Sequence, residues 1–69
     1  MIDLEIDGQK LYLQREKVGL SRTELADKAH VTYVRIWQLE TGVKSKVSPL
    51  LAASLSKILK IDAKKLELI

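Results

Sequence analysis

The chain has 69 residues, a hydrophobic fraction of 46%, an aromatic fraction of 4% and no cysteine. This composition suits one small domain over residues 1–69 with an aliphatic core, and it excludes disulfides and thiolate metal sites. No apolar run approaches the roughly 20 residues that span a bilayer. The first residues also lack the basic region of a secretory signal, so we expect a cytoplasmic protein with no membrane partner.

The net charge of +3 is unevenly distributed along the chain. Residues 1–7 contain three acids and no base, so residues 8–69 carry a charge of +6. A basic body of this kind suits a protein that turns one face toward the phosphates of nucleic acid. Ordinary solubility charge is the alternative interpretation.

The N-terminal extension, residues 1–7, alternates between apolar and polar residues. Ile2, Leu4 and Ile6 share one side of an extended chain, which predicts a short β-strand over residues 2–6. A disordered tail is the alternative. A strand needs a partner. We expect either the alternating residues 66–69, within one chain or across a dimer, or a second copy of the strand across a two-fold axis.

Five helices are expected to follow this extension. They lie at residues 9–18, 21–29 and 33–41, from Ser48-Pro49 onward, and after Asp62. Ser21 and Glu24 match a capping box, Thr32 suits the N-cap of the third helix, and Pro49 suits a first helical turn. Residues 43–47 are expected to form a loop. The predicted fold class is therefore an all-α five-helix bundle with a short N-terminal strand.

The helix-turn-helix over residues 21–41 carries the most specific pattern in the chain. Residues 19–32 read GLSRTELADKAHVT, residues 36–42 read IWQLETG, and residues 55–61 read LSKILKI. Together they resemble the signature of the phage-repressor and Cro-like family, the XRE-type helix-turn-helix proteins. The spacing also favours two closely crossing helices, because the small Ala26 falls at their crossing point.

The resemblance implies a recognition helix at residues 33–41 that lies in the major groove of DNA. The positions that match the base-reading residues of the family are Thr32, Tyr33, Val34 and Gln38. The expected phosphate contacts are Arg22, Arg35, Lys44 and Lys46, of which Arg35 suits either role. Arg15 and Glu40 match a structural ion pair of the family. The alternatives are a solvated polar face, a Tyr33 that packs on the scaffold, and plain loop charges at Lys44 and Lys46.

Three features depart from the family pattern. His30 stands where glycine is usual in the turn, which implies a left-handed histidine under some strain. Trp37 stands where a small or polar residue is common, and it suits a contact with DNA backbone, with the following loop or with a partner. The loop from Val43 to Ser48 is also slightly long.

These features predict a sequence-specific DNA-binding transcriptional regulator that binds a two-fold operator as a homodimer, of phage or mobile-element origin. Double-stranded DNA is the expected partner. We expect no cofactor, no metal and no small-molecule ligand, and no enzyme activity, because the chain has a single histidine, no nucleophile motif and no phosphate loop. The alternative is a protein-binding module on the same fold, an antitoxin or a recruiting subunit, with Leu13, Trp37 and Leu50 at the partner surface.

Overall fold

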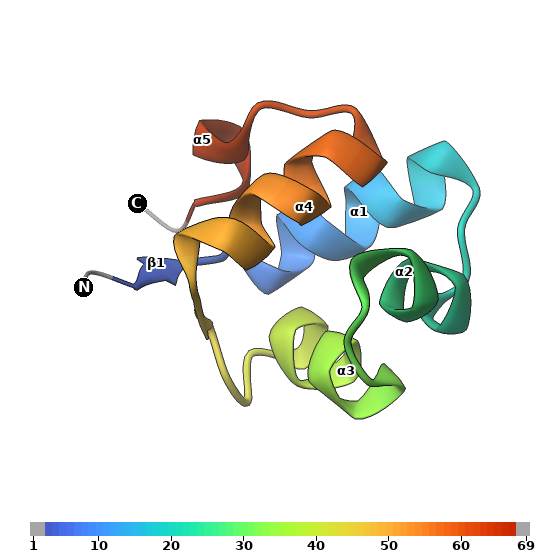
Figure 1. The fold of residues 1–69 in the computed structure, drawn as a ribbon, viewed down its shortest axis with the longest axis horizontal. Helices are drawn as coiled ribbons and strands as arrows, with labels where there is room; N and C mark the ends of the chain where they lie inside the picture. Colours follow the sequence, from blue (N-terminus) through green and yellow to red (C-terminus); the bar gives the residue numbers. More distant parts are fainter. Residues whose placement is uncertain (1–2, 68–69) are drawn as a thin grey trace.

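The computed structural model describes residues 3–67. Within this range the chain forms five α-helices and a two-stranded antiparallel sheet (Figure 1). The elements are β1 (Leu4–Glu5), α1 (Gly8–Val18), α2 (Arg22–Ala29), α3 (Tyr33–Thr41), β2 (Lys46–Val47), α4 (Pro49–Leu59) and α5 (Ala63–Leu66). In Figure 1, α4 crosses in front of α1. Helices α2 and α3 lie below them and to the right, and β1 and α5 lie to the left. The predicted five-helix bundle is confirmed.

The helices begin at the capping residues that the sequence indicates. The Ser21 hydroxyl accepts from the Glu24 N–H at 3.1 Å, and the Glu24 carboxylate accepts from the Ser21 N–H at 2.9 Å. This backbone hydrogen bond to Ser21 holds the pKa of Glu24 below its usual value, because it stabilises the charged form. The capping box therefore stabilises the fold above the usual titration range of glutamate, and its contribution is lost as the pH falls through the lowered pKa.

A single aliphatic core joins all seven elements. Its buried residues are Ile6, Leu11, Leu25, Ala26, Ala29, Ile36, Leu39, Val47, Ala52, Leu55, Leu59 and Leu66. The small Ala26 is buried where α2 packs against α3 and α4, as its spacing predicts. In α4, Ala52, Leu55 and Leu59 are buried, while Leu51 and Ile58 are only partly buried.

The sheet departs from the sequence-based expectation in its main strand partner. Residues 46–47 form β2 rather than loop, and they pair with β1 in the register Leu4↔Val47. The expected C-terminal partner contributes one bridge, Ile6↔Glu67, and residues 68–69 lie outside the described part of the chain. The Ile6 N–H donates to the Ser45 carbonyl at 2.7 Å. The strand thus finds its partners within its own chain, and a second copy is not needed to satisfy it.

The turn between α2 and α3 contains the expected left-handed histidine. His30 ends α2 with φ 58°, and its N–H donates to the Asp27 carbonyl. Lys60 ends α4 in the same way with φ 55°, a feature that we did not predict. Side chains with a Cβ are strained in this region, whereas glycine is not.

We expect His30→Gly to be neutral or to raise the free energy of unfolding, by up to about 1 kcal/mol, because relief of strain exceeds the added flexibility of the unfolded chain. Lys60→Gly should behave alike. Lys57→Gly, inside α4, should instead lower the free energy of unfolding by about 1 kcal/mol. Thermal unfolding of the three variants measures this difference, and a clear loss for His30→Gly would assign the imidazole a stabilising contact.

Candidate nucleic-acid interface

Helix α3 is divided between the core and the surface. Ile36 and Leu39 are fully buried, and the opposite side exposes Tyr33, Val34 and Trp37, with exposed fractions of 47%, 56% and 40%. This division follows from the helical period of the apolar residues. The face that α3 turns to solvent is therefore aromatic and aliphatic at its N-terminal half.

The remaining predicted base-reading residues lie at the two ends of this face. The Thr32 hydroxyl oxygen caps α3 by accepting from the Arg35 N–H at 3.2 Å, so its own hydrogen is available for donation. Gln38 is half-buried, and its backbone carbonyl accepts from the Lys44 N–H at 3.1 Å. Thr32, Tyr33, Val34 and Gln38 are thus all carried by α3 or its N-cap, on one rigid element.

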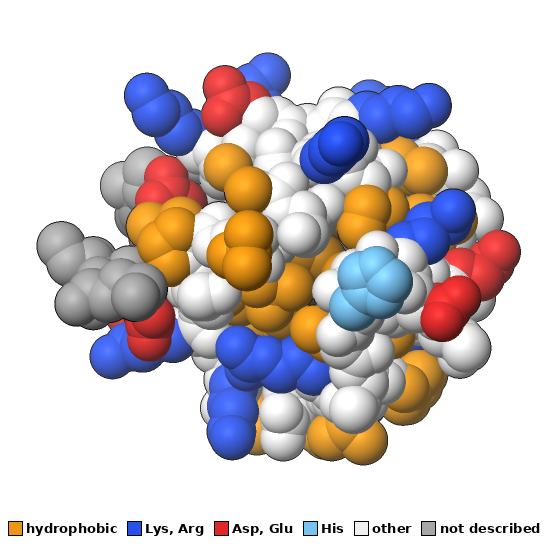
Figure 2. Space-filling view, viewed as in Figure 1, with side chains coloured by type: hydrophobic (Ala, Val, Ile, Leu, Met, Phe, Trp, Pro, Cys, Tyr) orange, Lys and Arg blue, Asp and Glu red, His pale blue; other side chains and the backbone are white. Residues whose placement is uncertain are grey.

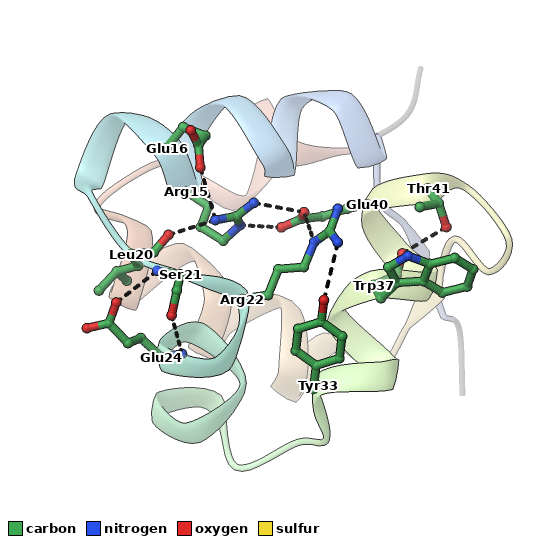
Figure 3. Close-up of polar contacts among 10 residues, drawn as sticks. All are labelled: Arg15, Glu16, Leu20, Ser21, Arg22, Glu24, Tyr33, Trp37, Glu40 and Thr41. Carbon is green, nitrogen blue, oxygen red and sulfur yellow. Dashed lines mark hydrogen bonds and ion pairs between the residues drawn. The ribbon is translucent and has the colours of Figure 1, made fainter.

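A buried carboxylate lies at the centre of three helices (Figure 3). Glu40, at the end of α3, has a side chain that is 1% exposed. It accepts from Arg15 of α1, with Nε–Oε2 at 2.6 Å and Nη2–Oε1 at 3.2 Å, and from Arg22 of α2, with Nε–Oε1 at 2.9 Å. The structure therefore brings Arg15 and Glu40 together, and it adds Arg22, for which we predicted a phosphate contact.

This network sets how α3 sits against α1 and α2. Arg15 Nη1 also donates to the Leu20 carbonyl at 2.7 Å, which fixes the turn between α1 and α2. The hydrogen bond to Glu40 raises the pKa of Arg15, so the guanidinium is charged at every physiological pH. On its outer side, Arg22 Nη1 lies 3.5 Å from the Tyr33 hydroxyl. One arginine thus connects the buried carboxylate to the exposed face of α3.

Of the other basic residues with predicted phosphate contacts, Arg35 lies within α3, and Lys44 and Lys46 lie beyond its end. Lys44 and Lys46 are exposed. Arg35 Nη2 donates to the Lys46 carbonyl at 2.8 Å, so the guanidinium of α3 is tied to the backbone of β2. The structure therefore places Arg35 with Lys46, and it places Arg22 separately, beside Tyr33. Because a guanidinium has five N–H donors, both arginines keep donors for a further acceptor.

Gly8 supports α3 in a way that the sequence analysis missed. A Cβ at this position would lie 2.7 Å from the Glu40 carbonyl oxygen and closer still to that of Leu39. The first residue of α1 therefore touches the backbone of α3, and a side chain would force the two apart. From the sequence, Gly8 suits the end of the strand and the start of a helix, and no local pattern indicates its contact with α3.

Two classes of site are not formed by the part of the chain that is described. Among residues 3–67, no group of three or more histidine or acidic side chains is placed to hold a metal ion. Across the same residues, no helix combines the length and the apolar character needed to cross a bilayer.

Solved structures of several regulators are similar to this chain. SinR, described as the master regulator for biofilm formation, in complex with DNA, has a TM-score of 0.79 and 26% identity, over 84% of this chain and 95% of that one. The controller protein C.AhdI from Aeromonas hydrophila has a TM-score of 0.76 and 28% identity, over 84% and 86%. The regulator ClgR from Corynebacterium glutamicum has a TM-score of 0.76 and 32% identity, over 83% and 60%.

The comparison with protein families gives a match over most of the chain. The family described as "Helix-turn-helix" matches residues 11–66, which include all of α2 and α3. A comparison with curated proteins gave no match. The family match and the similar regulators agree with the pattern at residues 19–42. The chain therefore belongs to the XRE-type helix-turn-helix family of DNA-binding transcription regulators, the phage-repressor and Cro-like family that its sequence resembles.

Proposed function

We propose that this protein is a sequence-specific regulator that reads its operator with α3 in the major groove of DNA. The observation that carries the proposal is the division of α3. Its buried side anchors the helix in the core, while its N-terminal half exposes Tyr33 and Val34 between basic residues. The structure of SinR in complex with DNA, which is similar to this chain, supports DNA binding by this fold.

Base reading is proposed for the residues that lie on this face. Gln38 offers a donor and an acceptor together, which suits adenine, and Val34 suits the methyl group of thymine. The hydroxyls of Thr32 and Tyr33 suit either a base edge or a nearby phosphate. These four side chains differ in chemistry, so together they can discriminate among base pairs.

Phosphate contacts are proposed for the basic residues around the helix. Lys44 and Lys46 are exposed on the segment that Arg35 ties to α3, which orients their ammonium groups relative to the recognition helix. Arg22 has a side chain that is 28% exposed beside Tyr33. Its contact with Glu40 holds the guanidinium in place, so that an N–H group remains to meet a phosphate.

We also propose that two copies bind one operator. A single copy measures 29 Å along its longest axis. Two copies side by side can therefore present their α3 helices about 34 Å apart, the distance between successive major grooves on one side of the duplex. The proposed operator accordingly has two related half-sites.

Selection of bound duplexes from a random pool tests the proposal most directly. We expect enrichment of sites with two half-sites whose centres lie about 10 base pairs apart. The matched control is a pool selected with a variant that carries alanine at Tyr33, Val34 and Gln38, which should give no common sequence. An unenriched pool with the unmodified protein would contradict sequence-specific binding and favour the protein-binding alternative.

Gln38→Ala should lower affinity for the selected site by about 1–3 kcal/mol and relax the choice of one base pair. The reason is the loss of a paired donor and acceptor at a base edge. Gln9→Ala, an exposed glutamine at the start of α1, is the control and should bind normally. Titrations on the preferred and on scrambled DNA measure the difference, and equal losses on both would remove Gln38 from base reading.

Lys44→Ala should weaken binding to all sequences about equally and reduce the slope of log affinity against log salt by roughly one unit, because one fewer phosphate is neutralised. Lys64→Ala, on α5, changes the net charge identically and should leave the slope unchanged. Binding titrations over a range of salt concentrations measure the slope. An unchanged slope for Lys44→Ala would exclude this residue from the phosphate contacts.

A further inference from the structure

A second surface of the molecule combines an apolar floor with a basic rim. Val18 of α1, Leu20 of the following turn and Ile58 of α4 line a groove of about 440 Å³. Lys28, Lys57 and Lys60 complete its lining. We name this surface the lysine-rimmed groove. Figure 2 shows basic side chains around an apolar spot at the upper right of the molecule.

No acid in the lining balances the charge of this groove, although Glu24, one helical turn before Lys28 in α2, interacts with that lysine from outside the groove. All three lysines are exposed, and no acidic residue lines the groove. Every ion pair found among residues 3–67 involves Arg15 or Arg22, so none of the three ammonium groups is paired within that range. Lys60 is moreover held in the left-handed conformation, where glycine would be unstrained. The rim therefore carries three positive charges that can pair with an incoming anion.

The walls of the groove are held in place before any partner arrives. Gln14 Nε2 donates to the Leu59 carbonyl at 2.8 Å, which ties α1 to the end of α4. The Leu20 carbonyl accepts from Arg15, and the Ser56 hydroxyl donates to the Ile61 carbonyl just beyond Lys60. A preorganised groove of this kind loses little conformational entropy on binding.

The groove is separate from the proposed DNA surface. Its lining comes from α1, α2, α4 and their ends, and no residue of α3 contributes. In Figure 1 the C-terminal ends of α1 and α4 lie at the upper right, whereas α3 lies at the bottom. A ligand in the groove thus leaves the recognition helix free.

We propose that the lysine-rimmed groove binds a short acidic amphipathic helix of another protein. Aliphatic side chains on one face of such a helix would cover Val18, Leu20 and Ile58, and carboxylates beside them would meet the three lysines. DNA fits this surface poorly, because a phosphate backbone offers nothing apolar to cover the aliphatic floor. The protein would then carry an acidic partner to its operator through a face that DNA does not use.

The test is a selection of peptides, each about four helical turns long, from a random displayed library on the complete 69-residue chain. We expect the enriched peptides to be net acidic, with aliphatic residues at helical spacing. A synthetic copy of the most enriched peptide serves as the probe. It should shift the amide resonances of Val18, Leu20 and Ile58 and leave those of α3 unchanged.

The matched variants decide the role of the rim. Lys28→Glu, Lys57→Glu and Lys60→Glu together should lower affinity for the probe at least about tenfold. Lys10→Glu, Lys64→Glu and Lys65→Glu, three exposed lysines outside the groove, make the same change in net charge and should lower it less than about twofold. If the reversed charges prevent folding, glutamine at positions 28, 57 and 60 removes the three positive charges without adding negative ones.

Four outcomes of the peptide and variant experiments would overturn the proposal. They are enrichment of basic or purely apolar peptides, shifts located on α3, equal losses in both triple variants, and a loss of self-association specific to the groove variant, which would identify a second copy as the occupant. Operator binding is measured in parallel. A loss of DNA affinity beyond that of the control variant would assign the lysines to DNA and also overturn the proposal, whereas failure of the unmodified chain to bind DNA would contradict the proposed function alone.

Discussion

Glu40→Ala is expected to unfold most of the protein at ambient temperature. Removing one partner from a buried ion pair costs about 3–5 kcal/mol, because the remaining charge is left without compensation. The Arg15 side chain is 6% exposed, and without Glu40 its buried charge would keep only the largely exposed Glu16 as an acidic partner. A single core in a domain below about 70–80 residues rarely supplies more than about 3–5 kcal/mol of stability, so a loss of this size removes most or all of the margin of this 69-residue chain.

The chain contains a matched control for this prediction. Glu16 contacts the same arginine at 3.2 Å, but its side chain is 55% exposed. Glu16→Ala should therefore lower the free energy of unfolding by less than about 1 kcal/mol. Urea unfolding followed by circular dichroism compares the two variants. Similar unfolding curves for Glu16→Ala and Glu40→Ala would show that burial of the pair has no special role.

A rescue variant separates the charge effect from a packing effect. Arg15→Met combined with Glu40→Leu replaces the buried pair with apolar side chains, an exchange that is often neutral or stabilising. We expect this double variant to fold. Its recognition helix would lack the contact from Glu40 to Arg22, so its affinity for the selected operator should fall even though the helical content is restored. If the double variant recovered both its helical content and its affinity for the operator, the network would contribute to stability alone.

The ends of α3 could be predicted because local chemistry determines them. Thr32 supplies an oxygen for the free N–H groups of the first turn, and Gly42 takes the left-handed conformation that ends the helix. The helix occupies residues 33–41, as predicted. His30 follows from the same logic, because the tight turn after α2 requires a left-handed residue whatever its type.

Contacts between distant segments were harder to predict. The pair Arg15 and Glu40 was expected only from the family resemblance, and the contact between Arg22 and Glu40 spans 18 residues with no local signal. β2 has two residues, too few for an alternating pattern to be recognised. Its partner lies about forty positions earlier in the chain, so only the packing of Val47 into the core reveals the pairing.

The N-terminal strand provides the last prediction, since its role in the structure differs from the one expected for a dimer interface. Ile6 is 2% exposed and belongs to the core cluster together with Leu66 and Val47. Ile6→Ala should therefore lower the free energy of unfolding by about 2–5 kcal/mol, through lost burial and the cavity left behind. Deletion of residues 1–6 would also remove the pairing of β1 with β2, so it should destabilise the helical core rather than leave it intact.

Glu5→Ala is the control for Ile6→Ala, because Glu5 of β1 directly precedes Ile6 and is exposed. It should change the free energy of unfolding by less than about 0.5 kcal/mol. Urea unfolding measures stability, and sedimentation at several protein concentrations measures self-association. If Ile6→Ala kept the stability of the unmodified chain but lost self-association, Ile6 would act between two copies after all. We expect the opposite, a less stable chain with unchanged assembly, because the side chain of Ile6 is already buried by its own chain and has almost no surface left for a second copy.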